Sequence, residues 1–432
     1  MDQQIFVYMD LDNTPHLLGR LWLHVRKRVE SATFRYDESW LRNPVRFALE
    51  PALQMDTAPH HTTEGKSLFG AIGDSAPDRW GRALMMRAEA RRARLAKEPA
   101  RTLWEGDYLL LVDDETRQGA LRFAEQERGP FLREAADHRT PPLIELPALL
   151  AASEHAYDKA ESDEELRLLL APGSSLGGAR PKASVRDKDG QLAIAKFPHH
   201  GDRIQTVLWE ALAFRLAAAA GIHTATARVE RVARRPVFLL RRFDRNGTAR
   251  RPFLSAMSML GATDHETRSY LEIADALQRY GAAPTEDLHE LWRRIVFSIL
   301  ISNTDDHLRN HGFLYEGNQG WRLSPAYDLN PVPVQFKPRI LTTLIDEQSG
   351  EASIDLALSV AESFRLSPPE ARKIVRKVAQ AVSRWRQEAA ALRIPAAEIE
   401  TVSSACRNRD CFIGLRARGT KMGSQFEKFG LE

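Results

Sequence analysis

The sequence predicts an α+β protein whose first part is rich in β-strands and whose C-terminal half is mainly helical. Positions 5–53 contain short runs of aromatic and β-branched residues beside turn signals, which is typical of a small β-sheet. A strand candidate at 191–197 follows a glycine- and serine-containing loop at 172–178, and helical periodicity dominates beyond Ser255. The predicted helices of this half span 270–280, 285–301, 352–364 and 368–392.

Length and composition narrow the class of protein. A chain of 432 residues exceeds what one hydrophobic core usually organises, so we expect two or three packed units. The formal net charge of +3 neither demands nor excludes a polyanionic partner. Cys406 and Cys411 lack companion histidines at zinc-finger spacing, which indicates neither a disulfide framework nor a structural metal. The cysteine content favours the reduced cytoplasm. No window holds about 18 uncharged apolar residues, so we expect a protein that does not span a membrane.

Two features divide the first half of the chain. Alanine, leucine, methionine and arginine dominate positions 83–96 and favour a helix. Pro141 and Pro142 indicate a connector, because proline removes a backbone donor and favours extended geometry. We therefore expect a boundary near these prolines, followed by an acidic helix at 161–170.

The strongest chemical pattern lies between Asn303 and Phe313. Asp305 and Asn310 stand five apart and match the D-x-x-x-x-N element of kinase catalytic loops. In that element the aspartate accepts the proton of the substrate hydroxyl, and the asparagine binds a magnesium ion. A shifted alignment with Asp306 as the base leaves only four residues to Asn310 and is less favoured. The alternative is that the acidic cluster only caps the preceding helix.

A second aspartate is expected in the same cleft. Asp328 follows a strand candidate and a Ser-Pro turn, 17 residues beyond His311. Magnesium prefers oxygen ligands and usually keeps several waters, so one carboxylate and one amide oxygen suffice beside ATP phosphates. The sequence therefore predicts Asp328 and Asn310 as magnesium ligands.

The loop at 173–182 offers glycines where a backbone can approach phosphate oxygens. It is not a P-loop, because Gly177 and Gly178 are not followed by Lys-Ser or Lys-Thr. Lys196 ends a strand with period-two alternation, and Glu210 in a helix at 207–220 is its candidate partner, as in kinases. A plain linker loop, an exposed lysine and a favourable helix N-terminal charge are the alternatives.

Five segments occur in a fixed order along the chain. They are Ser175-Leu176-Gly177-Gly178-Ala179-Arg180-Pro181-Lys182, Ile194-Ala195-Lys196-Phe197, Arg242-Phe243-Asp244-Arg245, Thr304-Asp305-Asp306-His307-Leu308-Arg309-Asn310 and Tyr327-Asp328. Together they resemble the HipA family of toxin kinases. The β-rich start and residues 69–82 also resemble the amino-terminal region of that family, so the resemblance covers nearly the whole chain.

The resemblance implies a two-lobed protein-kinase-like fold. The expected units are an N-terminal subdomain over 1–136, a nucleotide-binding lobe over 137–245 and a helical catalytic lobe over 246–432. It also implies a serine/threonine kinase that uses ATP and Mg²⁺ and acts as a toxin on a cytoplasmic protein; aminoacyl-tRNA synthetases are known targets in the family. A helix-turn-helix antitoxin would neutralise it, and contact with operator DNA would run mainly through that antitoxin.

Roles for individual residues follow from the same resemblance. Asp305 would be the catalytic base, Asn310 and Asp328 the magnesium ligands, and Ser175 the autophosphorylation site. Residues 241–243 would form the hinge near adenine. The residues expected to contact the nucleotide are Ser175, Gly177, Gly178, Lys196, Glu210, Arg241, Phe243, His307 and Asn310.

Two other functions remain as alternatives. His307 and His311, if placed at i, i+4 on a helix, would present two imidazoles to one metal and suggest a metal-dependent hydrolase. Gly312 disfavours a helix that continues past His311. A catalytically inactive co-repressor is disfavoured because the residues that phosphoryl transfer requires are retained.

Overall fold

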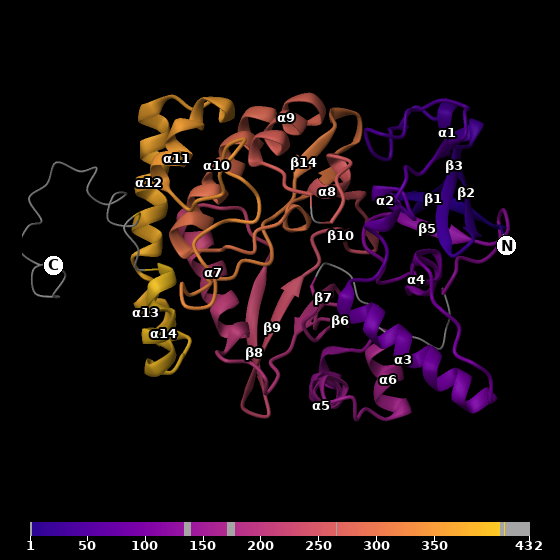
Figure 1. Cartoon of the computed structure of the whole chain (residues 1–432), viewed down its shortest axis with the longest axis horizontal. Helices are drawn as coiled ribbons and strands as arrows, with labels where there is room; N and C mark the ends of the chain where they lie inside the picture. The colour runs from indigo at the N-terminus through magenta and orange to yellow at the C-terminus, as the bar shows by residue number, and fades with distance from the viewer. Residues whose placement is uncertain (1, 134–139, 171–177, 265, 407–409, 411–432) are drawn as a thin grey trace, which may run out of the picture.

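The computed structural model describes residues 2–133, 140–170, 178–264, 266–406 and 410. Its N-terminal module is a five-stranded antiparallel sheet in the order β4-β3-β2-β1-β5 (Figure 1). The strands are β1 (Asp2–Leu11), β2 (Thr14–Arg26), β3 (Val29–Tyr36), β4 (His60–His61) and β5 (Leu121–Ala124). Asp12 and Asn13 both have positive φ, which suits the two-residue turn between β1 and β2. The predicted β-rich start is thus confirmed.

Helices connect this module to the next lobe. Short helices α1 (Glu38–Arg42) and α2 (Gly70–Gly73) precede α3 (Arg79–Ala96) and α4 (Glu105–Leu111). Asp78 caps α3 by accepting a hydrogen bond from the Gly81 N–H. Trp80 and Leu84 of α3 join a hydrophobic cluster that also contains α5 (Leu146–Tyr157) and α6 (Asp163–Leu170). The α3 helix therefore packs against the second lobe.

The second lobe contains an antiparallel sheet in the order β6-β7-β9-β8. Its strands are β6 (Lys182–Arg186), β7 (Leu192–Lys196), β8 (Ala227–Val232) and β9 (Arg235–Arg241). Ala193 and Ala195 of β7 face the cluster of α5 and α6, whereas Ile194 belongs to the core that includes helix α7 (Thr206–Ala220). Because side chains alternate along a strand, Lys196 shares the face of Ile194 and points toward α7.

The C-terminal lobe is mainly helical, as predicted. A small sheet of β12 (Phe253–Ser255), β13 (Gly312–Tyr315) and β14 (Trp321–Leu323) lies beside α8 (Ala256–Met259), α9 (Tyr270–Tyr280) and α10 (Pro284–Ile301). The remaining helices are α11 (Ile354–Ser359), α12 (Pro368–Val382), α13 (Trp385–Ala391) and α14 (Ala396–Cys406). The predicted helices at 352–364 and 368–392 are each broken into two, because the chain turns at Val360 and at Ser383.

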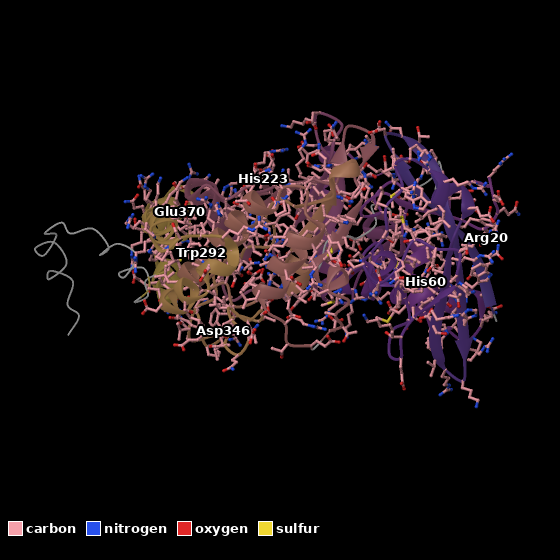
Figure 2. The ribbon with its side chains drawn as sticks, turned by 90° about the horizontal axis from the view of Figure 1, so that it is seen from above. Arg20, His60, His223, Trp292, Asp346 and Glu370 are labelled. Atoms are coloured by element: carbon pink, nitrogen blue, oxygen red, sulfur yellow. The ribbon has the colours of Figure 1, made fainter. Side chains whose placement is uncertain are left out.

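The lobes lie along the long axis of the molecule. Seen from above, Arg20 and His60 mark the N-terminal module near one end, and Trp292 and Glu370 mark the helical lobe toward the other (Figure 2). Trp292 is fully buried and its indole N–H donates to the Ala357 carbonyl, so it joins α10 to α11. No helix within the described part of the chain combines the length and the apolar character that crossing a membrane requires.

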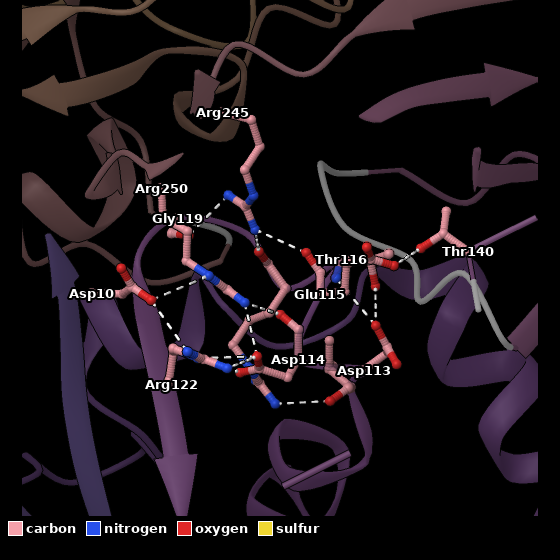
Figure 3. A network of polar contacts seen from close by, with 12 residues as sticks. Asp10, Asp113, Asp114, Glu115, Thr116, Gly119, Arg122, Thr140, Arg245 and Arg250 are labelled. Atoms are coloured by element: carbon pink, nitrogen blue, oxygen red, sulfur yellow. Dashed lines mark hydrogen bonds and ion pairs between the residues drawn. The ribbon is translucent and has the colours of Figure 1, made fainter. Parts of the chain in front are cut away.

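A buried network of charges fixes the N-terminal module to the rest of the chain (Figure 3). Asp114 binds Arg122 at 2.6 Å and Arg250 at 2.8 Å, and Arg122 also lies 3.2 Å from Asp10. Arg245 donates to the carbonyls of Glu115 at 3.1 Å and Gly119 at 3.0 Å. Buried charges cost several kcal/mol unless they are paired, so this network holds the module in one orientation.

Candidate active site

The loop after α10 presents two adjacent aspartates in opposite directions. Ser302 ends α10 in the left-handed conformation, with φ of 53°, and reverses the chain. A short 3-10 turn at Leu308–Asn310 then leads into β13. Between them the Asp305 side chain is 63% exposed, whereas the Asp306 side chain is 4% exposed. Asp305 is therefore accessible from solvent, whereas Asp306 belongs to the protein interior.

Asp306 anchors the loop to the helical lobe. Its Oδ2 accepts hydrogen bonds from the Tyr270 hydroxyl at 2.5 Å and the Ser298 hydroxyl at 3.1 Å, and its Oδ1 lies 3.1 Å from His311 Nε2. Burial opposes ionisation of Asp306, but His311 and the two hydroxyl groups outweigh it and hold the pKa below its ordinary value. With its oxygens engaged inside the core, Asp306 is unsuited to meet an incoming substrate. The geometry thus favours the alignment in which Asp305 is the base.

A hydrogen bond between Asn310 and Asp305 joins the two ends of the loop. The Asn310 amide nitrogen donates to the Asp305 carbonyl at 3.2 Å, which leaves the amide oxygen to act as an acceptor. The Asp305 carboxyl keeps its exposure although its Oδ1 lies 2.9 Å from Lys337 Nζ. The N–H of His307 also donates to the Asp305 carbonyl, at 2.9 Å.

Lys196 is the centre of a largely buried cluster of charges. Its Nζ lies 2.5 Å from Glu210 Oε1 and 3.0 Å from Asp328 Oδ1. Burial opposes protonation of Lys196, but the carboxylates of Asp328 and Glu210 outweigh it and raise the pKa of Lys196. Burial likewise opposes ionisation of Asp328, yet Lys196 holds its pKa below the ordinary value. The predicted contact between Lys196 and Glu210 is present. Asp328 is a second carboxylate that forms an ion pair with the same lysine.

Asp328 is held in an unfavourable backbone conformation. Its φ is 57°, which costs a residue other than glycine roughly 1–3 kcal/mol. Asn330 compensates in part, because its side-chain N–H donates to Asp328 Oδ1 at 3.3 Å. The preceding Tyr327 donates its hydroxyl hydrogen to the Arg309 carbonyl at 2.6 Å, so the segment with Asp328 lies against the loop with Asn310. Strain maintained in this way is characteristic of functional sites.

The glycine-containing loop is described only at its C-terminal end. Ser175 and Gly177 lie outside the described residues. Gly178 has φ of 105°, and its carbonyl accepts from the Trp80 N–H at 3.4 Å. A Cβ at Gly178 would lie 3.1 Å from Lys182 Nζ, so the backbone passes close to this lysine because no side chain intervenes.

Lys182 and Asp78 are residues of this region that the sequence reasoning missed. Lys182 Nζ binds Asp78 Oδ2 at 2.7 Å with both side chains buried, and Trp80 Nε1 donates to the Lys182 carbonyl at 3.0 Å. Lys182 also stands directly opposite Lys196 in the pairing of β6 with β7. Asp78 lies in the segment 69–82, which resembles the amino-terminal region of HipA proteins, but no sequence pattern connects this segment with the glycine loop. The start of α3 thus holds the end of that loop.

The predicted hinge residues lie in different environments. The Arg241 side chain is exposed and binds Asp189 at 2.9 Å, while its backbone N–H donates to the Thr226 carbonyl at 2.8 Å. The Arg241 side chain therefore forms an ion pair at the protein surface and does not contact the Lys196 cluster. Phe243 packs near Tyr327, with ring centroids 5.4 Å apart, and so lies beside the residue that precedes Asp328.

Comparison with known proteins identifies the domain to which these residues belong. Residues 174–385 match the family model of the HipA-like C-terminal domain. This part of the chain is similar to a HipA-like C-terminal domain. The matched range includes Lys196, Glu210, Asp305 and Asp328, and the resemblance to HipA proteins stated from the sequence motifs is confirmed.

Relatives of this HipA-like chain are named as kinases. "Putative kinase Y4mE" of Sinorhizobium fredii is 24% identical over 424 residues, which cover 88% of this chain and 93% of that protein. "Putative kinase" of Haemophilus influenzae is 31% identical over 99 residues, which cover 22% of this chain and 29% of that protein. A solved structure of the Shewanella oneidensis toxin-antitoxin system, HipA with HipB and operator DNA, matches with a TM-score of 0.63 at 15% identity, over 96% of this chain and 97% of that chain. The two-lobed kinase-like fold is thereby confirmed.

The geometry does not favour the alternative of a metal-dependent hydrolase in this HipA-like chain. A 3-10 turn separates His307 from His311, so the two imidazoles do not share one face of an α-helix. His311 is buried against Asp306, with its Nε2 3.1 Å from Asp306 Oδ1. Among the described residues no group of three or more His, Cys, Asp or Glu is arranged to hold a metal.

Proposed function

We propose that this chain is a serine/threonine protein kinase that transfers the γ-phosphoryl group of ATP. The observation that carries the proposal is that one domain holds both a cluster of charged side chains around Lys196 and an exposed aspartate. Lys196, Glu210 and Asp328 form a largely buried cluster, and Asp305 stands exposed five residues before Asn310. Phosphoryl transfer requires a lysine at the phosphates, a positioned carboxylate base and oxygen ligands for magnesium, and these residues supply all three.

In the proposed reaction, Asp305 accepts the proton of a serine or threonine hydroxyl. The hydroxyl oxygen forms a bond to the γ-phosphorus, and the bond from that phosphorus to the bridging oxygen of ADP breaks. Lys196 holds the α- and β-phosphates and Glu210 orients Lys196, while the end of the glycine loop at Gly178 supplies close backbone approach. In this proposal His307 would contact the nucleotide, and the chain at Arg241 and Phe243 would line the adenine end.

The oxygen donors of the site fit magnesium. Asp328 is kept ionised by Lys196, and the Asn310 amide oxygen is available as an acceptor, which suits a small hard cation. When bound, the ion supplies positive charge that neutralises the triphosphate. In this proposal Asp328 and Asn310 are its protein ligands.

The biological setting follows from the relatives. We propose that the kinase acts as a toxin on a cytoplasmic protein, with an aminoacyl-tRNA synthetase as one candidate, and that a helix-turn-helix antitoxin neutralises it. The similarity in fold to a HipA that was solved with HipB and operator DNA supports this proposal. Contact with DNA would be mainly indirect. The proposed division of the chain is 1–136, 137–245 and 246–432.

Ser175 is the proposed autophosphorylation site. A phosphoserine carries roughly −1.5 to −2 charges at pH 7, and in a loop that approaches ATP it would repel the nucleotide phosphates. Phosphorylated protein should therefore bind ATP poorly. Mass spectrometry of the protein after incubation with ATP, followed by ATP titration of both forms, tests this. Phosphate on another residue would refute the assignment of Ser175.

The direct test of the proposed function uses γ-labelled ATP. The purified chain should transfer label to its own serine or threonine, and to dephosphorylated casein as a general acceptor, only when magnesium is present. Phosphoamino acid analysis identifies the acceptor residue. Magnesium-dependent ATP binding without transfer would instead support an inactive co-repressor.

A further inference from the structure

A proline-containing segment crosses the exposed face of the catalytic loop. Residues 331–340 include Pro331, Pro333 and Pro338, which restrict the backbone because each fixes its φ. Within this segment Lys337 Nζ lies 2.9 Å from Asp305 Oδ1, and the two side chains are 53% and 63% exposed. No sequence pattern connects Lys337 with Asp305, which lie 32 positions apart.

The segment is attached on both sides of Lys337. On one side, Gln335 donates to the Thr401 carbonyl of α14 at 2.7 Å and accepts from the Ser404 hydroxyl at 3.0 Å. On the other side, Arg339 donates to the Ile299 carbonyl at the end of α10 at 3.0 Å.

Arg339 also binds Asp410 at 2.9 Å, and Asp410 in turn accepts from the Ile354 N–H at the start of α11. Two further contacts reach the segment from other elements. Arg203 of the nucleotide lobe lies over the Phe336 ring, 5.8 Å from its centroid, and Val334 donates its N–H to the Ser404 hydroxyl. A residue between such attachments is held in place without needing a strong contact of its own.

Building on the proposed kinase activity, we propose that Lys337 is a positioning residue that orients the Asp305 carboxylate for proton acceptance. The ion pair engages Oδ1, and the exposure of the carboxyl leaves Oδ2 accessible to a substrate hydroxyl. Proton transfer depends on the distance and direction of the acceptor oxygen. A carboxylate on a surface loop would otherwise rotate among rotamers, and Lys337 selects one.

The chemistry assigns no proton transfer to Lys337. The substrate hydroxyl proton goes to Asp305 Oδ2, the oxygen bonds to the γ-phosphorus, and ADP leaves with the electron pair of the broken P–O bond. Lys337 remains an ammonium ion throughout. The opposite hypothesis is that Lys337 blocks Asp305 until substrate displaces the lysine. That hypothesis predicts a faster transfer rate when Lys337 is removed.

The experiment compares Lys337→Met, Lys337→Arg and the control Lys373→Met, which removes an exposed lysine of α12. Transfer is followed as label from γ-labelled ATP incorporated into the chain and into casein. We expect Lys337→Met to lower the transfer rate at saturating ATP by about two- to fivefold, the range that an exposed ion pair can supply, with the KM for ATP unchanged. Lys337→Arg should restore most of the rate, and Lys373→Met should equal the wild type.

A double variant separates positioning from structural damage. If Lys337 acts through Asp305, Lys337→Met combined with Asp305→Asn should be no slower than Asp305→Asn alone. A further loss in the double variant, or an equal or faster rate in Lys337→Met, would overturn the inference while leaving the proposed function intact. A wild-type chain that transfers no phosphate would overturn both.

Discussion

The nucleotide side and the acceptor side of the candidate site are built differently. Lys196 and Glu210 are 14% and 6% exposed and lie 2.5 Å apart, whereas Asp305 and Lys337 are 63% and 53% exposed and lie 2.9 Å apart. Both are ion pairs of similar length. A buried pair is held strongly because losing one partner leaves an uncompensated charge, whereas an exposed pair is worth about 0–1 kcal/mol.

In the proposed kinase this difference in exposure has a functional reason. Every ATP molecule has the same phosphates, so the groups that hold them can be fixed in advance by the core. A protein substrate must reach the base from solvent, so the base has to stay accessible. Asp306 provides the rigidity that Asp305 lacks, because it anchors the same loop from inside.

The largest effect on stability is expected for Lys196→Met. This change leaves the buried Glu210 carboxylate, and the Asp328 carboxylate whose side chain is 28% exposed, without their shared cation, which should lower the free energy of unfolding by about 3–5 kcal/mol and remove ATP binding. Denaturant unfolding and ATP titration measure the two effects. Lys373→Met is the matched control. An equal decrease in the free energy of unfolding in both variants would show that the Lys196 cluster does not stabilise the fold.

Asp328→Ala should weaken ATP binding by about 10- to 100-fold, because hydrogen bonds and contacts to charged groups contribute roughly 1.5–3 kcal/mol each. The loss should appear only when magnesium is present, since the proposed role of Asp328 is to bind the metal. ATP titrations with magnesium and with EDTA separate the two conditions. The same magnesium dependence in the variant and in the wild type would exclude Asp328 as a ligand.

Asp306→Asn should lower the free energy of unfolding by about 1–3 kcal/mol, because the amide cannot satisfy the Tyr270 and Ser298 hydroxyls and His311 as the carboxylate does. The effect depends on pH. The folded pKa of Asp306 lies below the unfolded value, so its stabilisation is present above the unfolded pKa and is lost as pH falls through the folded pKa. Unfolding curves should therefore converge for the variant and the wild type in acid, and a constant difference at every pH would contradict this role.

The smallest effect is expected for the stability of Lys337→Met. Because the pair with Asp305 is mostly exposed, its loss should change the free energy of unfolding by less than about 1 kcal/mol, although the transfer rate falls. Thermal unfolding at low and high salt measures this. A large loss of stability would mean that Lys337 supports the fold and does not merely orient Asp305.

The sequence predicted the local patterns of this molecule better than its long-range contacts. The alternation that ends at Lys196 predicted a strand and the direction of this side chain, and helix periodicity placed Glu210. Both signals are local in the sequence. The contact between Lys196 and Glu210 follows once the strand and the helix pack together. The contact between Lys337 and Asp305 could not be predicted, because it depends on the path of an irregular, proline-containing segment.

The N-terminal motif shows the same limit. Residues 69–82 carry part of the family resemblance, but only the packing of α3 on the second lobe brings Asp78 to Lys182. The proposal that Asp305 and not Asp306 is the base has two supports. Asp305 stands five residues before Asn310, as in kinase catalytic loops, and the burial of Asp306 adds a physical reason that the sequence does not contain.

The measurement that most directly tests the proposed chemistry is phosphoryl transfer by Asp305→Asn and Asp306→Asn, made in parallel and compared per folded molecule. Asp305→Asn should lower the transfer rate by about 100- to 10,000-fold while ATP affinity and unfolding stay close to the wild type. Asp306→Asn should lose stability but retain most of the transfer rate in the fraction that is folded. Transfer that persists in Asp305→Asn and disappears in folded Asp306→Asn would contradict the assignment of Asp305 as the base.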